Sequence, residues 1–436
     1  MRMVAKKVAA QKVIKKSVSK TPTAKRPLGV KETATPGGFV FANPRPSPDD
    51  YGNFSKADVF ADSNVTASTA ILPIPKSWRQ PEVLDLGQVL SAAEVQQIQS
   101  AGSMVFHTVG DTGGIKEPSK QFAVADALAA DLANKTYQNG LPAFFYHLGD
   151  VVYYLGQERY YYDQFYDPYR DYDAPIFAIP GNHDGMVSPS IPQKTLAGFY
   201  ENFCTKTTAK NPEAQGFART TMTQPGVYFT LNAPLVKIIG LYSNISEGAT
   251  EGVISGGVVG TAQLTFLQQQ LKAAVQERAA GTRRVLMIAV HHPPFTGSQD
   301  HAPSPKMLAD IDSVCQQAGI LPDMVLSGHA HLYERYTRFV GTNQIPFVVA
   351  GTGGYFNLSG FKRNSSGATP KLPFMGTDAK GNKLRLDAFD ENDFGFLRVT
   401  VSTAALKVEF LAVDLNTKAV TLKDHFNLDL NRHIVS

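Results

Sequence analysis

The chain has 436 residues, of which 43% are apolar and 10% aromatic, a composition typical of an ordinary globular protein. This length allows two or three domains, or one large α/β unit with a sizeable core. No run of about 18 apolar residues is present, so the sequence predicts no membrane span. The two cysteines, Cys204 and Cys315, match no metal or redox spacing.

The formal net charge of +4 is distributed unevenly. Ten of the 42 lysines and arginines precede the first acidic residue, Glu32, so the remaining chain has 32 basic and 38 acidic residues, a net charge of −6. We expect residues 1–34 to form a disordered basic tail. Such a segment, rich in Lys, Ala, Ser and Thr and without aromatic residues, buries too little apolar surface to offset its chain entropy.

Three interpretations of this tail remain open: an arm that binds nucleic acid or an anionic surface, a targeting segment, and a solvated leader without a specific partner. The nucleic-acid interpretation is the less favoured main function, because the acidic remainder of the chain lacks a compensating basic surface. No apolar stretch of about 7–15 residues follows the lysines, so a Sec-type signal is not visible. This favours the cytoplasm but leaves the compartment open.

Residues 35–90 are rich in Pro, Gly, Asp and Asn, which indicates an irregular N-terminal cover segment with one or two short strands. The spacing of Ser91 and Glu94 is that of a capping box and predicts a helix that ends near Ser100. We expect the main domain to extend over residues 91–436, with loop insertions near 185–222 and 356–385.

From residue 103 onward, predicted strands alternate with predicted helices, and several strands end in polar side chains. The expected strands are 103–109, 143–148, 174–179, 226–231, 235–242, 284–290, a strand that leads into His329, and antiparallel strands over 394–428. The expected helices are 119–134, 159–169, 262–278 and 306–318. This order is typical of an α/β sheet with its chemistry at the carboxyl ends of the strands.

Five strand ends carry side chains that bind metals, and we expect them to be neighbours in space. They are Asp111; Asp150 with Tyr153; Asn182 with His183; His291; and His329 with His331. Each alone is explained by a turn, a cap or a core histidine. Together, however, carboxylate, amide and imidazole groups at one sheet edge need a positive charge between them.

The ligand types also indicate which metals to expect. Oxygen and nitrogen donors without thiolate favour iron, manganese or zinc. One carboxylate can bridge two ions about 3.5–4 Å apart, the spacing found in two-metal phosphoesterases. The pattern therefore predicts a hydrolase with two metal ions.

These motifs resemble the five-block signature of purple acid phosphatases, within the calcineurin-like metallophosphoesterases. The matching residues are Asp111-x-Gly113, Gly149-Asp150-x-x-Tyr153, Gly181-Asn182-His183-Asp184, Ile288-x-x-His291 and Gly328-His329-x-His331. Ile288 stands where Val is usual, a conservative departure. The resemblance implies an α/β (α+β) fold, a four-layer α/β/β/α sandwich of two mixed β-sheets flanked by helices, with residues 91–436 as the catalytic domain.

The resemblance also implies a division of the ligands. A ferric ion would be held by Asp111, Asp150, Tyr153 and His331, and a divalent ion (Fe, Zn or Mn) by Asp150, Asn182, His291 and His329. The broader superfamily has a histidine where this chain has Gly113, and Tyr153 supplies the missing ligand. His183 would face the substrate as a catalytic residue and Asp184 would orient it.

Two further residues are substrate-binding candidates. Asn182 lies next to His183, and His301 follows His291 by ten positions, as a substrate-side histidine does in longer family members, although Asp300 precedes it instead of another histidine. We expect hydrolysis of phosphate monoesters on a small phosphorylated substrate by a metal-bound hydroxide. The alternative is a phosphodiesterase or nucleotide hydrolase of the same superfamily. The oligomeric state is not predicted.

Overall fold

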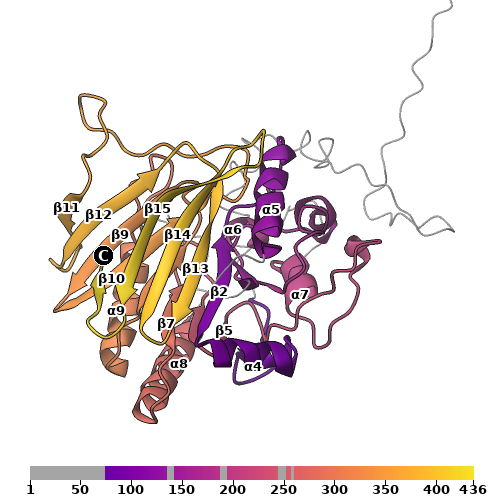
Figure 1. Cartoon of the computed structure of the whole chain (residues 1–436), viewed down its shortest axis with the longest axis horizontal. Coiled ribbons are helices and arrows are strands. Elements are labelled where there is room, and N and C mark those ends of the chain that lie inside the picture. Colours follow the sequence, from indigo (N-terminus) through magenta and orange to yellow (C-terminus); the bar gives the residue numbers. More distant parts are fainter. Residues whose placement is uncertain (1–73, 135–141, 187–193, 244–251, 257–259) are drawn as a thin grey trace, which may run out of the picture. The chain divides into compact units, whose positions relative to one another are not determined.

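Figure 1 shows a computed structural model of the whole chain. It describes residues 74–134, 142–186, 194–243, 252–256 and 260–436. The predictions for the basic tail and for most of the cover segment fall outside these residues and stay predictions. Among the helices in the described ranges, none is long and apolar enough to cross a membrane.

The strands in these ranges form two mixed sheets, which we call sheet A and sheet B. Sheet A has nine described strands, in the spatial order β1 (Val83–Asp85), β5 (Phe229–Asn232), β6 (Val236–Gly240), β7 (Val285–Ala289), β8 (Met324–Ser327), β10 (Asn343–Ala350), β9 (Tyr333–Val340), β12 (Lys383–Asp390) and β11 (Phe374–Thr377). The strands β6, β7, β8 and β10 pair in parallel, and β9, β12 and β11 extend the sheet in antiparallel fashion.

Sheet B has seven described strands, in the spatial order β16 (Ile434–Val435), β15 (Val420–Asp429), β14 (Ala405–Val413), β13 (Gly395–Ser402), β2 (Ser103–Val109), β3 (Pro142–His147) and β4 (Ile176–Ala178). Strands β2, β3 and β4 are parallel, and β13 pairs antiparallel with β2. Each sheet therefore contains a run of parallel strands, β6, β7, β8 and β10 in sheet A and β2, β3 and β4 in sheet B, and the carboxyl ends of each run share one edge.

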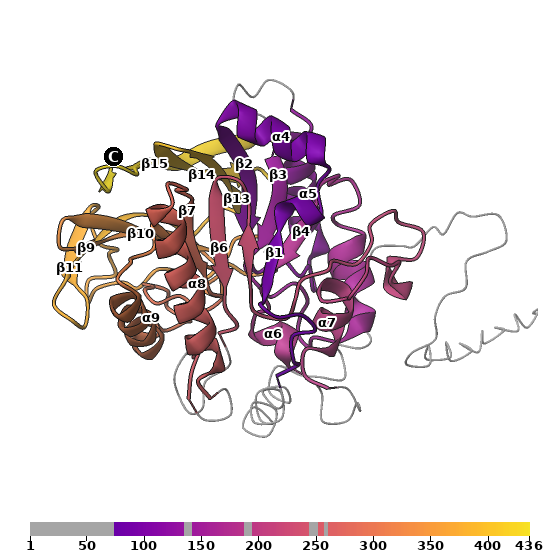
Figure 2. The same cartoon turned by 90° about the horizontal axis from the view of Figure 1, so that it is seen from below.

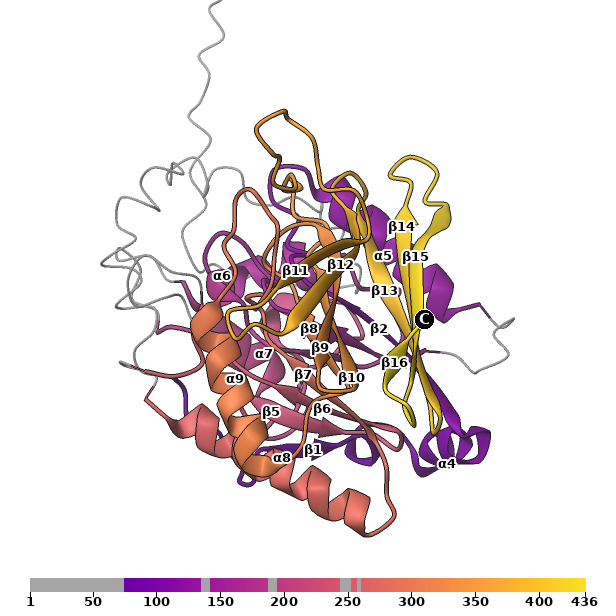
Figure 3. The same ribbon diagram turned by 90° about the vertical axis from the view of Figure 1, so that its left-hand side faces the viewer.

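Helices cover the outer faces of both sheets. The described helices are α4 (Ala92–Ala101), α5 (Pro118–Leu132), α6 (Asn182–Gly185), α7 (Ala197–Phe203), α8 (Ala262–Ala279) and α9 (Pro305–Ala318), with short 3₁₀ or π turns at Leu86–Gln88, Glu158–Tyr160, Tyr162–Tyr166 and Pro212–Ala214. Figure 3 shows α8 and α9 outside sheet A. In Figure 2, α4 and α5 lie beside β2 and β3 of sheet B.

The apolar pattern of the strands explains these layers. In sheet A, Ile239 and Ile288 pack with Leu267 of α8, whereas their neighbours Ile238 and Met287 belong to the core that also contains sheet B. Successive side chains of a strand point to opposite faces, so β6 and β7 in sheet A are buried on both sides.

Helix α5 is bound to the outer face of sheet B by a buried polar contact. The carboxylate of Asp131 on α5 lies 2.7 Å from His107 Nε2 of β2 and accepts from the guanidinium of Arg398 on β13 at 2.6 Å. Helices, sheet A, sheet B and helices thus form four layers, as predicted.

Several predicted elements are confirmed. Helix α4 begins after Ser91, whose side chain accepts from the backbone of Glu94 in a capping box, and β2 has the predicted bounds. The predicted loop at 356–385 is wrong in part, because it contains β11 and the start of β12, and these strands pair with each other and with β9. The insertion at 185–222 contains α7, and the predicted helix at 159–169 is only short 3₁₀ and π turns.

Candidate active site

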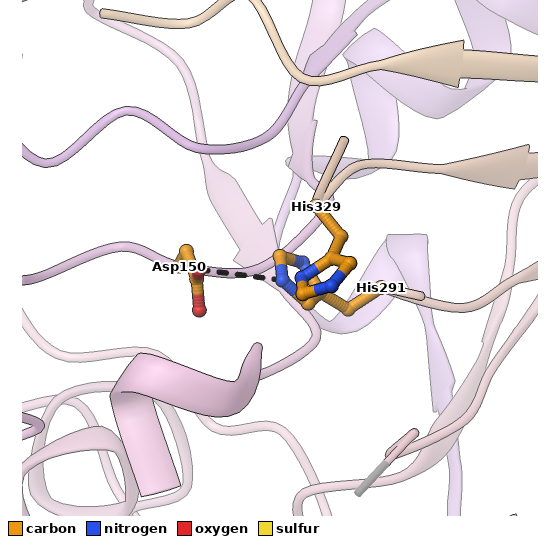
Figure 4. A group of neighbouring side chains, drawn as sticks. All are labelled: Asp150, His291 and His329. Atoms are coloured by element: carbon orange, nitrogen blue, oxygen red, sulfur yellow. Dashed lines mark ion pairs between the residues drawn. The ribbon is translucent and has the colours of Figure 1, made fainter. Parts of the chain in front are cut away.

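The side chains predicted to bind metal lie at the carboxyl ends of strands from both sheets. Asp111 follows β2 and Asp150 follows β3 in sheet B, while His291 follows β7 in sheet A, and the pair His329 and His331 follows β8. Figure 4 shows Asp150 facing the imidazoles of His291 and His329. The structure therefore brings the polar ends of two sheets to one place, as expected from parallel strands.

The first group of side chains surrounds the hydroxyl of Tyr153. Asp111, Asp150 and His331 each offer one ligand atom, all within 4.8 Å of one another. Tyr153 Oη donates to Asp111 Oδ1 at 3.1 Å and lies 3.1 Å from His331 Nε2. All four residues are at least nine-tenths buried. These are the residues that the resemblance implies for the ferric ion.

The second group lies beside the first and shares Asp150 with it. Asp150, His291 and His329 again have ligand atoms within 4.8 Å of one another. The amide oxygen of Asn182 lies 3.2 Å from His291 Nε2 and 3.0 Å from His329 Nδ1. These four residues are the ones that the resemblance implies for the divalent ion.

The donor atoms of Asp150 and His291 fit a cation between the two groups. Among the described residues, Asp150 Oδ2 is buried without a hydrogen-bond partner, and its ion-pair neighbour is His291 Nε2 at 3.3 Å. Burial disfavours an imidazolium, but Asp150 and Asp111 outweigh this effect and raise the pKa of His291 to about 9. The site thus attracts positive charge strongly, and a metal ion would supply it in place of the proton.

Backbone strain is concentrated in the same residues. The φ angles of Asp111, Asp150, His329 and His331 are 57°, 54°, 67° and 45°. This left-handed region costs a residue with a side chain about 1 kcal/mol or more, and such strain gathers at functional sites, where the surrounding structure holds it in place. Four of the seven predicted metal ligands thus have a strained backbone, as expected for residues of a functional site.

Gly113 leaves the space that Tyr153 fills. A Cβ atom at Gly113 would lie 2.4 Å from Gln164 Oε1 and 2.7 Å from Tyr153 Cδ2, so no side chain fits there. The amide of Gln164 accepts from the backbone N–H of Tyr153 at 2.9 Å and donates to its carbonyl at 2.8 Å. Sequence reasoning did not identify Gln164 as the residue that positions Tyr153, because its contacts become visible only in three dimensions.

His183 is positioned by the backbone and not by Asp184. Its Nδ1 lies 2.8 Å from the carbonyl oxygen of Tyr154, and its backbone N–H donates to Asp150 Oδ1 at 2.9 Å. Asp184 instead accepts from the backbone N–H groups of Val151, Val152 and Gly181. Among the described residues, no direct contact therefore supports the predicted role of Asp184 in orienting the His183 ring. The Asp184 carboxylate instead connects the loop after β3 with the loop after β4.

Two further histidines line the site. The His301 ring lies 4.3 Å from the His329 ring and 5.2 Å from the His331 ring, and the side chain is only partly buried. The structure therefore brings this substrate-binding candidate next to both groups. His292 is buried 4.1 Å behind the His329 ring, and its Nδ1 contacts Ser243 Oγ at 2.9 Å, which indicates a supporting role.

An aromatic cluster borders the first group, and sequence reasoning missed it. The Tyr355 ring lies 4.3 Å from that of Tyr153 and 4.4 Å from that of His331. Phe356 stacks beside Tyr355 at 4.7 Å, and the Tyr154 hydroxyl lies 3.4 Å from that of Tyr355. The motif Gly353-Gly354-Tyr355-Phe356, directly after β10, was the signal that could have revealed it.

Comparisons with solved structures found several matches at low identity. A purple acid phosphatase, PPD1, from yellow lupin (Lupinus luteus) seeds is 16% identical with a TM-score of 0.49, and the match covers 75% of this chain and 54% of the lupin protein. GAP50, described as the anchor in the inner membrane complex of Plasmodium, is 13% identical over 74% of this chain and 90% of that one, with a TM-score of 0.47. PhoD is 12% identical over 77% and 71% of the two chains, with a TM-score of 0.45.

The curated protein sequences contained no significant match. The sequence profile of the calcineurin-like phosphoesterases, in contrast, matches residues 104–333. This region contains every predicted metal ligand and more than half of the 436 residues. The chain therefore belongs to the calcineurin-like phosphoesterase family.

Proposed function

We propose that this protein is a phosphatase of the purple acid phosphatase type, which hydrolyses phosphate monoesters with two metal ions. The observation that carries the proposal is the position of Asp150, which belongs to both groups of potential ligands. A carboxylate shared by two such groups is the arrangement of a two-metal phosphoesterase. The family membership supports the phosphoester as the substrate class.

The residues of the chain would divide the work as follows. Asp111, Asp150, Tyr153 and His331 would hold one ion, and Asp150 together with Asn182, His291 and His329 the other. When bound, a pair of such ions activates water and stabilises charge on the attacking and leaving oxygens.

Two histidines remain for the substrate. His183 Nδ1–H donates to the Tyr154 carbonyl and fixes the ring, so Nε2 would give its proton to the leaving oxygen from the imidazolium form, which the charge of Asp150 favours. His301, whose ring lies beside those of His329 and His331, would bind a phosphate oxygen.

Tyr153 supports an iron ion in the first group. A phenol is a rare metal ligand, and a phenolate on ferric iron gives an absorption band in the visible range. The protein purified with its metals and then oxidised is therefore expected to be coloured. Zinc alone, without colour, would disprove the iron assignment but leave the hydrolase.

The test of the proposal is metal content and hydrolysis in Asp150→Asn, with Asp171→Asn as the control at an exposed carboxylate. We expect wild type and Asp171→Asn to bind two ions and to hydrolyse 4-nitrophenyl phosphate. Asp150→Asn should lose both ions and the activity, while circular dichroism shows a retained fold. Two ions and full activity in Asp150→Asn would refute the scheme.

The same assay separates the alternative within the superfamily. A phosphodiesterase or nucleotide hydrolase would prefer bis(4-nitrophenyl) phosphate or a nucleotide to the monoester. That result would leave the metal site in place but overturn the monoester assignment.

A further inference from the structure

Lys116 lies at the edge of the candidate active site and holds its charge over aromatic rings. Its Nζ is 4.3 Å from the centre of the Phe356 ring and 5.8 Å from that of Tyr154. The side chain is exposed, and within the described ranges no carboxylate pairs with it. An ammonium held by rings alone keeps its positive charge available to an anion.

These rings connect Lys116 with the residues proposed to act on the phosphate. The Tyr154 ring lies 5.9 Å from the ring of His183, and the Tyr154 carbonyl fixes that ring. Phe356 contacts Tyr355, which in turn packs on His331. One ring, that of Tyr154, therefore lies between Lys116 and His183, and two rings, those of Phe356 and Tyr355, connect it with His331.

The backbone around Lys116 fixes its position. Its φ angle of 61° is in the left-handed region, which is costly for a lysine. The preceding Ile115 is fully buried in the aromatic cluster. Two contacts attach this loop to that of Phe356: Lys120 Nζ donates to the Phe356 carbonyl at 2.7 Å, and the backbone N–H of Tyr355 donates to the Asp111 carbonyl at 2.9 Å. The backbone that carries Lys116 is thus anchored to the loop of Phe356.

We propose that Lys116, together with the rings of Tyr154 and Phe356, forms a second anion subsite next to the candidate metal site. The preferred substrates are then phosphoesters that carry a second negative group besides the scissile phosphate. This inference rests on the proposed function for its chemistry, but binding alone tests it.

The experiment measures binding of two phosphonates to the metal-loaded full chain by isothermal titration calorimetry. Methylphosphonate carries only the phosphonate group, whereas phosphonoacetate adds a carboxylate. Lys116→Met removes the charge but keeps an apolar chain on the rings, and Lys116→Arg keeps the charge. Lys272→Met, at an exposed position on α8, is the control.

We expect wild type, Lys116→Arg and Lys272→Met to bind phosphonoacetate more tightly than methylphosphonate. In Lys116→Met the ratio of the two dissociation constants should fall about tenfold, the size of one charge-assisted hydrogen bond. Methylphosphonate affinity should stay the same, and added salt should reduce the preference of the wild type. Because phosphonoacetate also chelates metals, only the change in the ratio is decisive.

The outcomes separate the two proposals. An unchanged ratio in Lys116→Met, or equal loss of affinity for both ligands, overturns the subsite while hydrolysis by the wild type leaves the proposed function intact. A wild type that hydrolyses no monoester but shows the charge-selective binding overturns the function and supports the subsite.

Discussion

Tyr153 is the residue on which the assignment within the family depends. Its hydroxyl lies between Asp111 and His331, each 3.1 Å away. Burial and the neighbouring Asp111 raise the pKa of Tyr153 well above its ordinary value. Without a cation the phenol stays protonated and donates to Asp111. Ionisation to a phenolate therefore requires a strongly charged metal ion at this position.

We expect Tyr153→Phe to keep the fold and lose the visible absorption band. The phenylalanine ring retains the packing on Tyr355, while the oxygen that contacts Asp111 and His331 is gone. The absorption spectrum and the iron content of the oxidised protein test this expectation. Tyr355→Phe is the control, because within the described ranges the Tyr355 hydroxyl makes a single hydrogen bond, a 3.4 Å contact with Tyr154. A band that survives in Tyr153→Phe would place the iron elsewhere.

His183→Ala is predicted to keep both metal ions and to slow turnover. The ring contacts the Tyr154 carbonyl through Nδ1, and His183 is not part of either ligand group. Loss of a general acid typically costs about 10²–10⁴-fold, and more for an alkyl than for an aryl leaving group. Metal content and kcat on glycerol 2-phosphate and 4-nitrophenyl phosphate test this, with the exposed His425→Ala as the control. Equal losses on both substrates would argue against proton donation.

At the scale of elements, the loops of the site are held by carboxylates buried behind them. Asp184 joins the loops after β3 and β4 through three backbone N–H groups. Burial and Asp150 raise the pKa of Asp184 to about 7. On sheet A, Glu334 of β9 accepts from the backbone N–H of Gly297 at 2.6 Å, in the loop that leads to His301. Buried carboxyl groups thus position the loops of the site.

Glu334 is expected to make the stability of the protein depend on pH. Burial, only partly offset by contacts with Gly297, Thr296 and Tyr336 and by the charge of Lys362, raises the pKa of Glu334 from an ordinary 4.5 to about 7. A raised carboxyl pKa favours the protonated form in the folded protein. The stability contribution is therefore fully present below pH 4.5 and is lost as the pH rises toward 7.

Glu334→Gln removes this ionisation and keeps an acceptor for Gly297. Between pH 4.5 and 7.5 the wild type should lose up to about 3 kcal/mol of unfolding free energy relative to the variant. Urea unfolding of both proteins across this range measures the difference, in which the other titrating groups cancel. If the unfolding free energies of the two proteins changed in parallel with pH, folding would not change the pKa of Glu334.

At the scale of the whole molecule, the parallel strands and their polar ends could be predicted from the sequence. Apolar runs such as Ser103–Val109 and the aspartate that follows each run are local features, and fold class follows from their order. The grouping of the ligands, in contrast, was implied by the family resemblance. Local patterns alone do not say which histidine faces Tyr153.

Strand β9 shows why other parts of the fold could not be predicted from the sequence. Arg335 and Arg338 interrupt its apolar pattern, although both are at least nine-tenths buried. Arg338 is neutralised by Asp312 of α9 at 2.6 Å and Asp378 at 2.7 Å, and Arg335 by Asp424 at 2.7 Å. Buried charges require partners, and these partners come from distant segments. The aromatic cluster with Tyr355 was missed for the same reason.

The two sheets are also joined by a contact at the end opposite the candidate site. A substitution there should lower the stability of the protein without changing its activity. The carboxylate of Asp323 is fully buried and lies 2.7 Å from His433 Nε2, which precedes β16 of sheet B. Asp323 directly precedes β8, whereas His329 lies beyond the other end of that strand. The contact therefore lies one strand length away from the candidate metal site.

We expect His433→Ala to lower the unfolding free energy by about 1–2 kcal/mol, because Asp323 loses one hydrogen bond but keeps those from Arg278 at 2.8 Å and from the backbone of Leu286 at 2.7 Å. Metal content and kcat should stay unchanged. Urea unfolding, metal analysis and phosphatase assays of the same preparation test both parts, with the exposed His425→Ala on β15 as the matched control. A loss of metal in His433→Ala would mean that the joint between the sheets, and not the loops alone, sets the geometry of the site.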